Sequence, residues 1–314
     1  MKHLDDVDSC SLGQFMPTHY QENRLMESAR MAAYKAAILY ATAPGARVLE
    51  LGGGTGVLSW FAAAKAERVY CVEQNADMAL RARALLDLNR CGHKVEVVHA
   101  NAFDYLPPEP VDLVICEMAH AGLLREPQLE LIASFKRRYR ARFGGPMPRF
   151  LPEAHLLAVQ PLQQDYDFAG FRAPIVQLQT PGLCYPGTLE LAAPQIYRSI
   201  DQAEASAPTM RWDGCLTPTV AGTLNALRFV TKNILAIVQE HGSCIDQHCP
   251  YLVLPLERAV TVRPGESLRL AFQYRAGASI ASLQRSLRLT RTAAASTHAV
   301  PLARRSAAPV SLAH

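Results

Sequence analysis

The first half of the chain repeats a pattern of short apolar runs separated by stretches with helical spacing. The apolar runs predict buried strands at Val48–Leu51, Arg68–Val72, Val95–His99 and Val111–Cys116. Apolar residues at helical spacing predict helices over Glu22–Tyr40, Val57–Ala66, Ala76–Asn89 and Gln128–Tyr139. Strands that alternate with helices predict an α/β fold with a doubly wound, Rossmann-like parallel sheet.

The pattern changes after the Gly/Pro-rich stretch that ends at Pro148. From there on no long amphipathic helix is evident, and Pro and Gly separate short apolar runs. These runs are Ala154–Val159, Ala226–Val230, Ile234–Val238, Tyr251–Leu256, Ala259–Val262 and Ser267–Tyr274. The residues Arg263–Glu266 predict a turn between two strands. An antiparallel β domain is therefore expected in the second half.

This pattern divides the chain into four parts. We expect a flexible N-terminus at 1–14, a nucleotide-binding domain at 15–148, a β domain at 149–290 and a low-complexity, mobile tail at 291–314.

A glycine cluster follows the first predicted strand. Gly52, Gly54 and Gly56 leave the backbone open to a ligand, while Val57 occupies the sixth position, where a dinucleotide-binding loop has glycine. Glu50 lies inside the motif, and Glu73 ends the next strand, where its carboxylate can accept hydrogen bonds from both ribose hydroxyls. The arrangement resembles motif I of class I S-adenosylmethionine-dependent methyltransferases. A dehydrogenase is disfavoured, and so is a glycine turn without a ligand, because strand, turn, helix and acid coincide.

Composition narrows the class of protein further. The chain has 314 residues, 49% hydrophobic and 19% charged, which is ordinary for a globular protein. No apolar run reaches the roughly 18 residues of a membrane span, and the acidic N-terminus lacks a signal core, so we expect a cytoplasmic protein without membrane partners. We expect reduced cysteines, with Cys71 and Cys116 inside apolar strands. The net charge of +4 is mild. The basic run 136–142 indicates a solvated helix end more than a nucleic-acid patch.

Two acids flank the loop after the fourth predicted strand. Glu117 directly follows the strand, and Glu126 comes nine residues later. In a doubly wound sheet the ligand crevice lies beyond the carboxyl ends of the strands. Two carboxylates in one pocket repel unless a cation separates them, and a planar guanidinium can pair with both. The alternative, equally supported by spacing, is that Glu126 is an exposed acid at the start of a helix.

These residues, taken in order, resemble the protein arginine methyltransferase family from about Phe15 to Leu270. That family has a "double-E" loop with acids nine residues apart, as Glu117 and Glu126 are. Its barrel begins with a Phe-Pro-Asp/Glu motif, similar to residues 151–153. Its Thr-His-Trp loop aligns with residues 247–249, and its Arg-x-x-x-Tyr motif aligns with residues 30–34.

The resemblance implies roles for several residues. It implies an S-adenosylmethionine cofactor whose methionine carboxylate binds Arg30, and paired acids at Glu117 and Glu126 that hold a guanidinium. It implies that Glu27 pairs with His248, and that the two orient each other and pass on a proton. It also implies a C-terminal β-barrel and a homodimer.

The chain departs from the family where aromatic residues would enclose an arginine. Met118, Ala121 and Cys249 stand at those positions, and Phe15 alone matches the N-terminal aromatic motif. The segment between Gln160 and Ala193 shows no obvious long dimerisation arm and leaves room for a shortened one. These differences indicate a divergent, bacterial member.

The function predicted is methyl transfer to a guanidino nitrogen of arginine, in a protein or free, or of a small guanidino metabolite. A non-guanidino acceptor and a catalytically silent binding or oligomerisation module are the alternatives.

Two further sets of residues carry weaker signals. Asn101 follows the third strand, where this fold meets the adenine; capping of the turn explains it equally well. No metal is predicted, because the possible ligands lack a second pair at zinc-finger spacing; they are His241, Cys244, His248 and Cys249.

Overall fold

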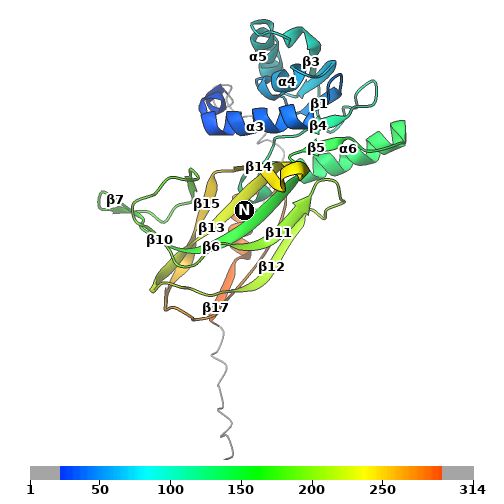
Figure 1. Ribbon diagram of the computed structural model, residues 1–314. Coiled ribbons are helices and arrows are strands. Elements are labelled where there is room, and N and C mark those ends of the chain that lie inside the picture. The colour runs from blue at the N-terminus through cyan, green and yellow to red at the C-terminus, as the bar shows by residue number, and fades with distance from the viewer. Residues whose placement is uncertain (1–21, 292–314) are drawn as a thin grey trace, which may run out of the picture.

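A five-stranded parallel sheet forms the first part of the protein (Figure 1). The computed structural model describes residues 22–291. The strand order of the sheet is β3-β2-β1-β4-β5. The strands are β1 (Arg47–Leu51), β2 (Arg68–Glu73), β3 (Val95–His99), β4 (Leu113–Ile115) and β5 (Arg149–Leu151). Strand β5 was not predicted, and residues 149–151, expected in the β domain, pair with β4 in this sheet.

Helices cover both faces of the sheet. They are α3 (Ser28–Ala41), α4 (Val57–Ala63), α5 (Ala76–Asp87) and α6 (Gln128–Phe143), with the 3-10 turns η1 (Arg24–Met26), η2 (Gly92–Lys94) and η3 (Ala121–Leu123). Val48 of β1 packs in one core with α3 and α4, while Leu49 and Leu51 pack with α6 in the other. Because successive side chains of a strand point to opposite faces, a strand buried on both sides is almost entirely apolar.

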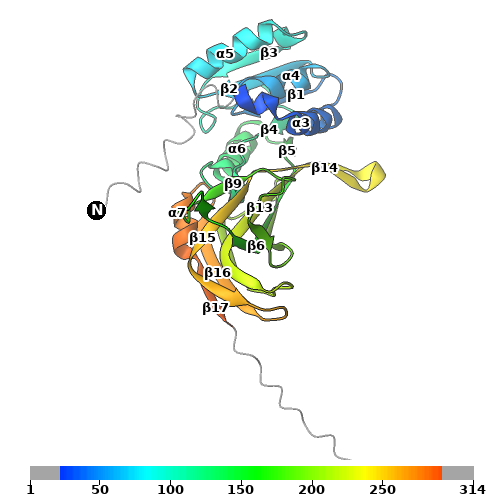
Figure 2. The same ribbon diagram turned by 90° about the vertical axis from the view of Figure 1, so that its left-hand side faces the viewer.

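The second part of the protein consists of antiparallel strands that curl around one core (Figure 2). A seven-stranded sheet and a three-stranded sheet contribute most of it. The longer strands are β6 (Ala154–Gln164), β11 (Gln195–Asp201), β12 (Thr209–Leu216), β13 (Gly222–Val238), β14 (Ser243–His248), β15 (Tyr251–Val262) and β16 (Leu268–Arg275). The shorter elements are β7 (Asp167–Phe168), β8 (Phe171–Arg172), β9 (Gln177–Gln179), β10 (Thr188–Glu190), η4 (Gln239–His241), α7 (Ile280–Ser286) and β17 (Arg288–Arg291).

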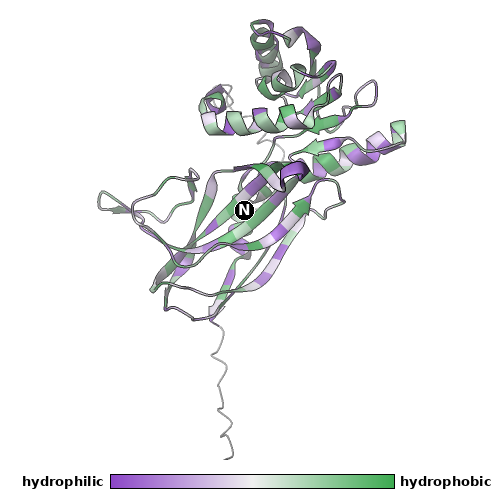
Figure 3. Ribbon diagram, in the orientation of Figure 1, coloured by the Kyte–Doolittle hydropathy of each residue, from purple (hydrophilic) through white to green (hydrophobic). Residues whose placement is uncertain are grey.

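Hydrophilic and hydrophobic residues alternate along these strands (Figure 3), as expected for strands with one buried face. The predicted fold classes, a doubly wound sheet and then an antiparallel β domain, are confirmed. Two pairs of predicted runs prove to be single strands, β13 and β15. Polar residues at 231–233 interrupt the apolar pattern of β13, although its pairing with β6 is continuous there. In β15 a bulge, rather than a turn, separates the two runs. The predicted turn Arg263–Glu266 joins strands of two different sheets.

Strand β13 connects the two parts. Its Leu235 and Ala236 are fully buried in the same core as Tyr34 and Ile38 of α3. The strand therefore extends from the β domain to the helix that carries Arg30. Residues 1–21, with Phe15, and 292–314 lie outside the described part of the chain.

Candidate active site

The glycine turn between β1 and α4 lies tightly against β2. The amides of Gly52 and Gly53 both donate to the carbonyl of Val72 at 2.9 Å. A Cβ on Gly53 would lie 2.2 Å from Sγ of Cys71, so this position tolerates no side chain. Gly52 adopts φ +80°, a conformation that favours glycine. Sequence and packing together explain why glycines cluster here.

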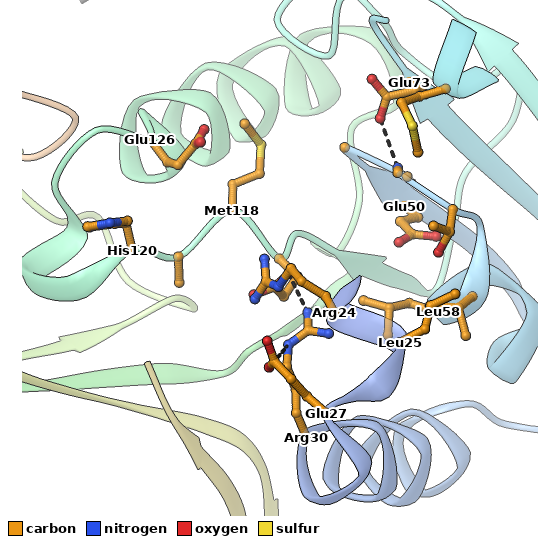
Figure 4. A pocket seen from close by; sticks show the side chains of 18 of the residues that line it. Arg24, Leu25, Glu27, Arg30, Glu50, Leu58, Glu73, Met118, His120 and Glu126 are labelled. Carbon is orange, nitrogen blue, oxygen red and sulfur yellow. Dashed lines mark hydrogen bonds and ion pairs between the residues drawn. The ribbon is translucent and has the colours of Figure 1, made fainter. Parts of the chain in front are cut away.

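Glu73 closes the turn from the end of β2. Its Oε2 accepts the amide of Gly54 at 2.8 Å and its Oε1 accepts the amide of Asn75 at 2.8 Å (Figure 4). The carboxylate is thus fixed at the edge of the cavity, with its remaining lone pairs available to a ligand.

Glu50 lies beneath the turn and is only 1% exposed. It accepts hydrogen bonds from the amide of Ser59 at 2.9 Å and from the Ser59 hydroxyl. Burial nevertheless raises the pKa of the Glu50 carboxyl to about 8, and the nearby carboxylates of Glu73 and Glu117 add to the rise. Glu50 is therefore mostly protonated at neutral pH.

Glu117 joins two arginines. Its Oε2 accepts from Nη2 of Arg30 at 2.6 Å, and its Oε1 accepts from Nη2 of Arg24 at 3.0 Å. Arg30 is 7% exposed and stacks over the ring of Tyr34, whereas Arg24, on the short turn η1, is 23% exposed. The carboxylate after β4 thus binds guanidinium groups, two of them from the chain itself.

The loop 117–126 carries the second acid. The backbone has positive φ at Gly122, Leu123 and Arg125. Glu126 follows, two residues before α6 begins, and lines the cavity. Burial raises the pKa of the Glu126 carboxyl, and the charge of Glu117 raises it further. Among residues 22–291 no hydrogen bond or ion pair to the Glu126 carboxylate is present.

The β domain fixes this loop from the other side. The amide of Gly122 donates to Oγ1 of Thr231 at 2.7 Å, and its carbonyl accepts from the hydroxyl of Tyr274 at 2.8 Å. Further along, the amide of Arg125 donates to the carbonyl of Ala278 at 2.9 Å. The strained backbone of the loop is held by these contacts, as is common at functional sites.

One cavity of about 200 Å³ brings most of the predicted site residues together. Its lining includes five glutamates and two arginines, so its charge favours cationic ligands. The lining residues among those predicted are Glu27, Arg30, Glu50, Gly52, Gly54, Glu73, Glu117 and Glu126.

Three predicted residues lie outside this lining. Gly56 is the N-cap of α4 and has φ +78°. Asn101 caps its own turn by accepting the amide of Phe103 at 2.9 Å, while the adjacent Ala102 lines the cavity. His248 ends β14, and no hydrogen bond or ion pair between it and Glu27 occurs within the described range. Instead, Glu27 lies 4.0 Å from Nε of Arg30.

Arg24 was not among the predicted site residues, although it lies in the predicted first helix, six residues before Arg30. It gave no separate signal, because a cation on a helix is usually solvated. The buried residues Gln128, His155 and Asn233 were not predicted either. Over residues 22–291 there is no cluster of three or more side chains suited to a metal ion, and no helix long and apolar enough to cross a membrane.

Comparison with known proteins identifies the first part of the chain. A family described as a methyltransferase domain matches residues 48–141. Protein arginine N-methyltransferase PRMT10 of Arabidopsis thaliana is 37% identical over 133 residues, which are 41% of this chain and 34% of that protein. The chain thus matches about a third of this plant relative. An uncharacterized protein of Methanothermobacter thermautotrophicus is 26% identical over 277 residues, 87% of this chain and 99% of that protein.

Two solved structures share the fold of the whole chain. An open conformation of PRMT10 from Arabidopsis thaliana has a TM-score of 0.66 at 22% identity and covers 84% of this chain and 89% of its own. The PRMT1 enzyme-prozyme complex of Trypanosoma brucei, with AdoHcy, has a TM-score of 0.64 at 19% identity and covers 79% and 85%. The chain therefore carries a methyltransferase domain and has the fold of the protein arginine methyltransferases, which confirms the resemblance read from its motifs.

Proposed function

We propose that the protein transfers a methyl group from S-adenosylmethionine to a guanidino nitrogen of arginine, either protein-bound or free, or of a related small guanidino compound. One observation carries this proposal: Glu117, at the end of β4 and beside the glycine turn, already binds two guanidinium groups at 3.0 and 2.6 Å. The names of the matched relatives, which are arginine methyltransferases, support it.

The cavity fits the proposed cofactor in charge and in donors. Nε of Arg30 is buried and makes no hydrogen bond, so a donor is available for an anionic group such as the methionine carboxylate. Glu73 would hold the ribose hydroxyls, and the backbone at Gly52 and Gly54 would lie against the nucleoside. When bound, S-adenosylmethionine supplies an electrophilic methyl group on a cationic sulfur.

In the proposed reaction Glu117 and Glu126 hold the acceptor guanidinium and orient one of its nitrogens toward the methyl group. Alignment of reacting atoms by fixed partners supplies much of the rate enhancement in such reactions. The nitrogen that gains the methyl group loses one proton, and the acceptor remains a cation. Glu126 is suited to accept that proton, because burial and Glu117 raise the pKa of its carboxyl.

The proton route through Glu27 and His248 has less support. Burial and Lys232 lower the pKa of the His248 imidazole, but no contact joins it to Glu27 in the described chain. We therefore assign the proton to Glu126 first.

A non-guanidino acceptor is the second candidate. Arg24 places an internal cation on Glu117, where a guanidinium acceptor would bind. The absence of aromatic residues at Met118, Ala121 and Cys249 also removes the walls that would enclose an arginine side chain.

We also propose a cytoplasmic homodimer. We assign a short dimerisation arm to residues 165–190. Its β7 and β8 project from the β domain (Figure 1), whereas its β9 and β10 pair with strands of the seven-stranded sheet. The arm exposes large apolar side chains, and so does α5. Those on the arm are Phe168, Phe171, Ile175, Val176, Leu178, Leu183 and Leu189; those on α5 and the residue after it are Leu80 and Leu88. Apolar area of this kind is typical of an interface between subunits. All seven described cysteines are free thiols, in keeping with the cytoplasm.

A single assay tests the function. A panel of guanidino compounds and arginine-containing peptides is incubated with methyl-labelled S-adenosylmethionine, and the products are identified by mass spectrometry. Methylation of a guanidino nitrogen is expected. Methylation only of acceptors that lack a guanidino group would establish the second candidate, and cofactor binding without turnover on any acceptor would indicate a silent module.

Light scattering tests the dimer. We expect the wild-type mass to be twice that of the chain, and Phe171→Asp to give a monomer, because a charge cannot be buried at an apolar contact. Wild-type monomer at the same concentration would refute the homodimer.

A further inference from the structure

A closed ring of buried side chains lies directly beneath the residues that follow Glu117. Gln128 is the first residue of α6, His155 lies in β6 and Asn233 lies in β13, and all three are fully buried. None of them lines the cavity, so none touches a ligand there. Buried polar groups of this kind lower stability unless every one of them is paired.

Hydrogen bonds run from the loop through all three side chains. The amide of Met118 donates to Oε1 of Gln128 at 3.2 Å. Nε2 of Gln128 lies 3.2 Å from Nε2 of His155, and Nδ1 of His155 lies 2.8 Å from Oδ1 of Asn233.

The chain of bonds returns to the loop by a second route. Nδ2 of Asn233 donates to Oε1 of Gln247 at 3.2 Å and lies 3.5 Å from Sγ of Cys249. The Cys249 thiol in turn donates to the carbonyl of Ala119 at 3.5 Å. Burial raises the pKa of this thiol to about 12, so it keeps its proton. The amide after Glu117 and the carbonyl of the next residue are therefore held by one ring.

The directions of these bonds are mutually consistent only for one form of the histidine. Asn233 gives its amide hydrogens to Gln247 and Cys249, so its oxygen must accept the Nδ1–H of His155. Nε2 of His155 is then an acceptor, and it takes a hydrogen from the Gln128 amide. That leaves Oε1 of Gln128 to accept the Met118 amide. Burial lowers the pKa of His155 to about 4, which keeps the ring neutral as this assignment requires.

We propose that Gln128, His155 and Asn233 are positioning residues: through the neutral imidazole they set the direction of the Gln128 amide, and so the placement of the Glu117 carboxylate. The inference rests on the proposed function for its effect on rate, but the hydrogen-bond ring itself is testable without turnover. Glu117 lies on the loop beyond the carboxyl end of β4, and a loop needs such support to hold a reacting group within about 0.5 Å.

The first test replaces the amide but keeps its shape. Gln128→Met removes both bonds of the Gln128 side chain, and we expect kcat to fall by about 10- to 100-fold while the KM for S-adenosylmethionine changes little. Gln160→Met is the matched control, because Gln160 is a buried glutamine of the β domain whose partners, Ala192 and Arg228, do not belong to the ring. The control variant should lose stability without losing kcat.

The second test reverses the direction of the bonds. In Asn233→Asp the new carboxylate stabilises the protonated imidazole, so Nε2 of His155 becomes a donor and the Gln128 amide must turn its oxygen toward it. The Met118 amide then faces an NH₂ group, and kcat should fall. Adding Gln128→Glu should restore much of it, because a carboxylate accepts from both sides.

Two readouts do not require activity. Nitrogen NMR of His155 should show a neutral ring protonated at Nδ1 in the wild type and a protonated ring in Asn233→Asp. Hydrogen exchange at the Met118 amide should be slow in the wild type and at least tenfold faster in Gln128→Met, since its acceptor is lost. A wild-type rate and wild-type exchange in Gln128→Met would overturn the proposal. If no acceptor is methylated but both readouts appear as expected, the ring stands and the proposed function fails.

Discussion

The two sides of the cavity are built in different ways. The side around the glycine turn is assembled from residues close together in the chain: Glu73 binds the amides of Gly54 and Asn75, and Glu50 binds Ser59. The side around Glu117 and Glu126 depends on a loop with an unusual backbone that the β domain holds at several points. A locally built site can be preserved while a site held by distant contacts changes its ligand, and in this chain the departures from the family fall on the second side.

The largest effect is expected on the side of the paired acids. Glu117→Gln leaves the buried Arg30 with a neutral partner, and Glu126→Gln removes the second acid. If a guanidinium binds between them, each change should lower kcat/KM by roughly a hundred-fold or more, since breaking one partner of a buried ion pair costs about 3–5 kcal/mol.

The double variant sharpens this test. It should lose less than the sum of the single losses, because both acids act on one group. Cofactor binding by Glu126→Gln, followed by calorimetry, should survive. Near-normal methylation of a guanidino acceptor by Glu126→Gln would show that only one acid acts, and the non-guanidino candidate would then be favoured.

The next effect tests the glycine side. S-adenosylhomocysteine should raise the melting temperature of the wild type, whereas NAD should not, because Val57 stands where a dinucleotide loop needs glycine. Glu73→Ala should remove most of the shift by taking away the acceptor for the ribose. Stabilisation by NAD alone would contradict a methyltransferase site.

A third prediction concerns Glu50 and pH. The carboxyl has its pKa raised from about 4.5 to about 8 by burial in the folded protein, so the folded state binds a proton that the unfolded state releases. The stability it contributes is complete below about pH 4.5 and is lost as the pH rises through about 8. Glu50→Gln should flatten the fall in melting temperature over that interval. If the dependence of the melting temperature on pH were the same in Glu50→Gln as in the wild type, Glu50 would be ionised in the folded protein.

The smallest effect is expected at Arg24. This side chain is partly exposed and pairs with Glu117, so an acceptor guanidinium must compete with it. Removing a pair of this kind changes free energy by about 0.5–1 kcal/mol, and Arg24→Met should therefore lower the KM for a guanidino acceptor by about two- to fivefold. A higher KM would mean that Arg24 binds the acceptor itself, through a negative group such as a carboxylate. Arg81→Met, which removes the surface pair with Glu22, is the control.

The sequence predicted the glycine side well because its information is local. Strand, glycines and acid follow one another within 26 residues, and apolar periodicity identifies each element. The fifth strand was missed because β5 has only three residues. The continuity of β13 was missed because the polar residues Thr231, Lys232 and Asn233 interrupt its apolar pattern.

The side around Glu117 and Glu126 could be predicted only in part. The spacing of Glu117 and Glu126 pointed to a shared pocket, but the partner of Glu117 lies 93 residues away at Arg24. The ring beneath the loop joins residues separated by 27 and 78 positions, at His155 and Asn233. A buried neutral histidine has no signature in a single sequence, because its role depends on which atoms face it after folding.

Strand β13 has a consequence for how the protein can evolve. From Leu227 to Leu235 every second residue of the strand is buried, and these residues have four roles. Leu227 and Phe229 fill the β-domain core, and Thr231 accepts the Gly122 amide. Asn233 completes the ring, and Leu235 packs against α3. Side chains of a strand alternate between faces, so a one-residue insertion before Leu227 would turn all five away together. Substitutions can therefore alter the side of the cavity around Glu117 and Glu126 one position at a time, whereas insertions and deletions are confined to the hairpin ends of this strand.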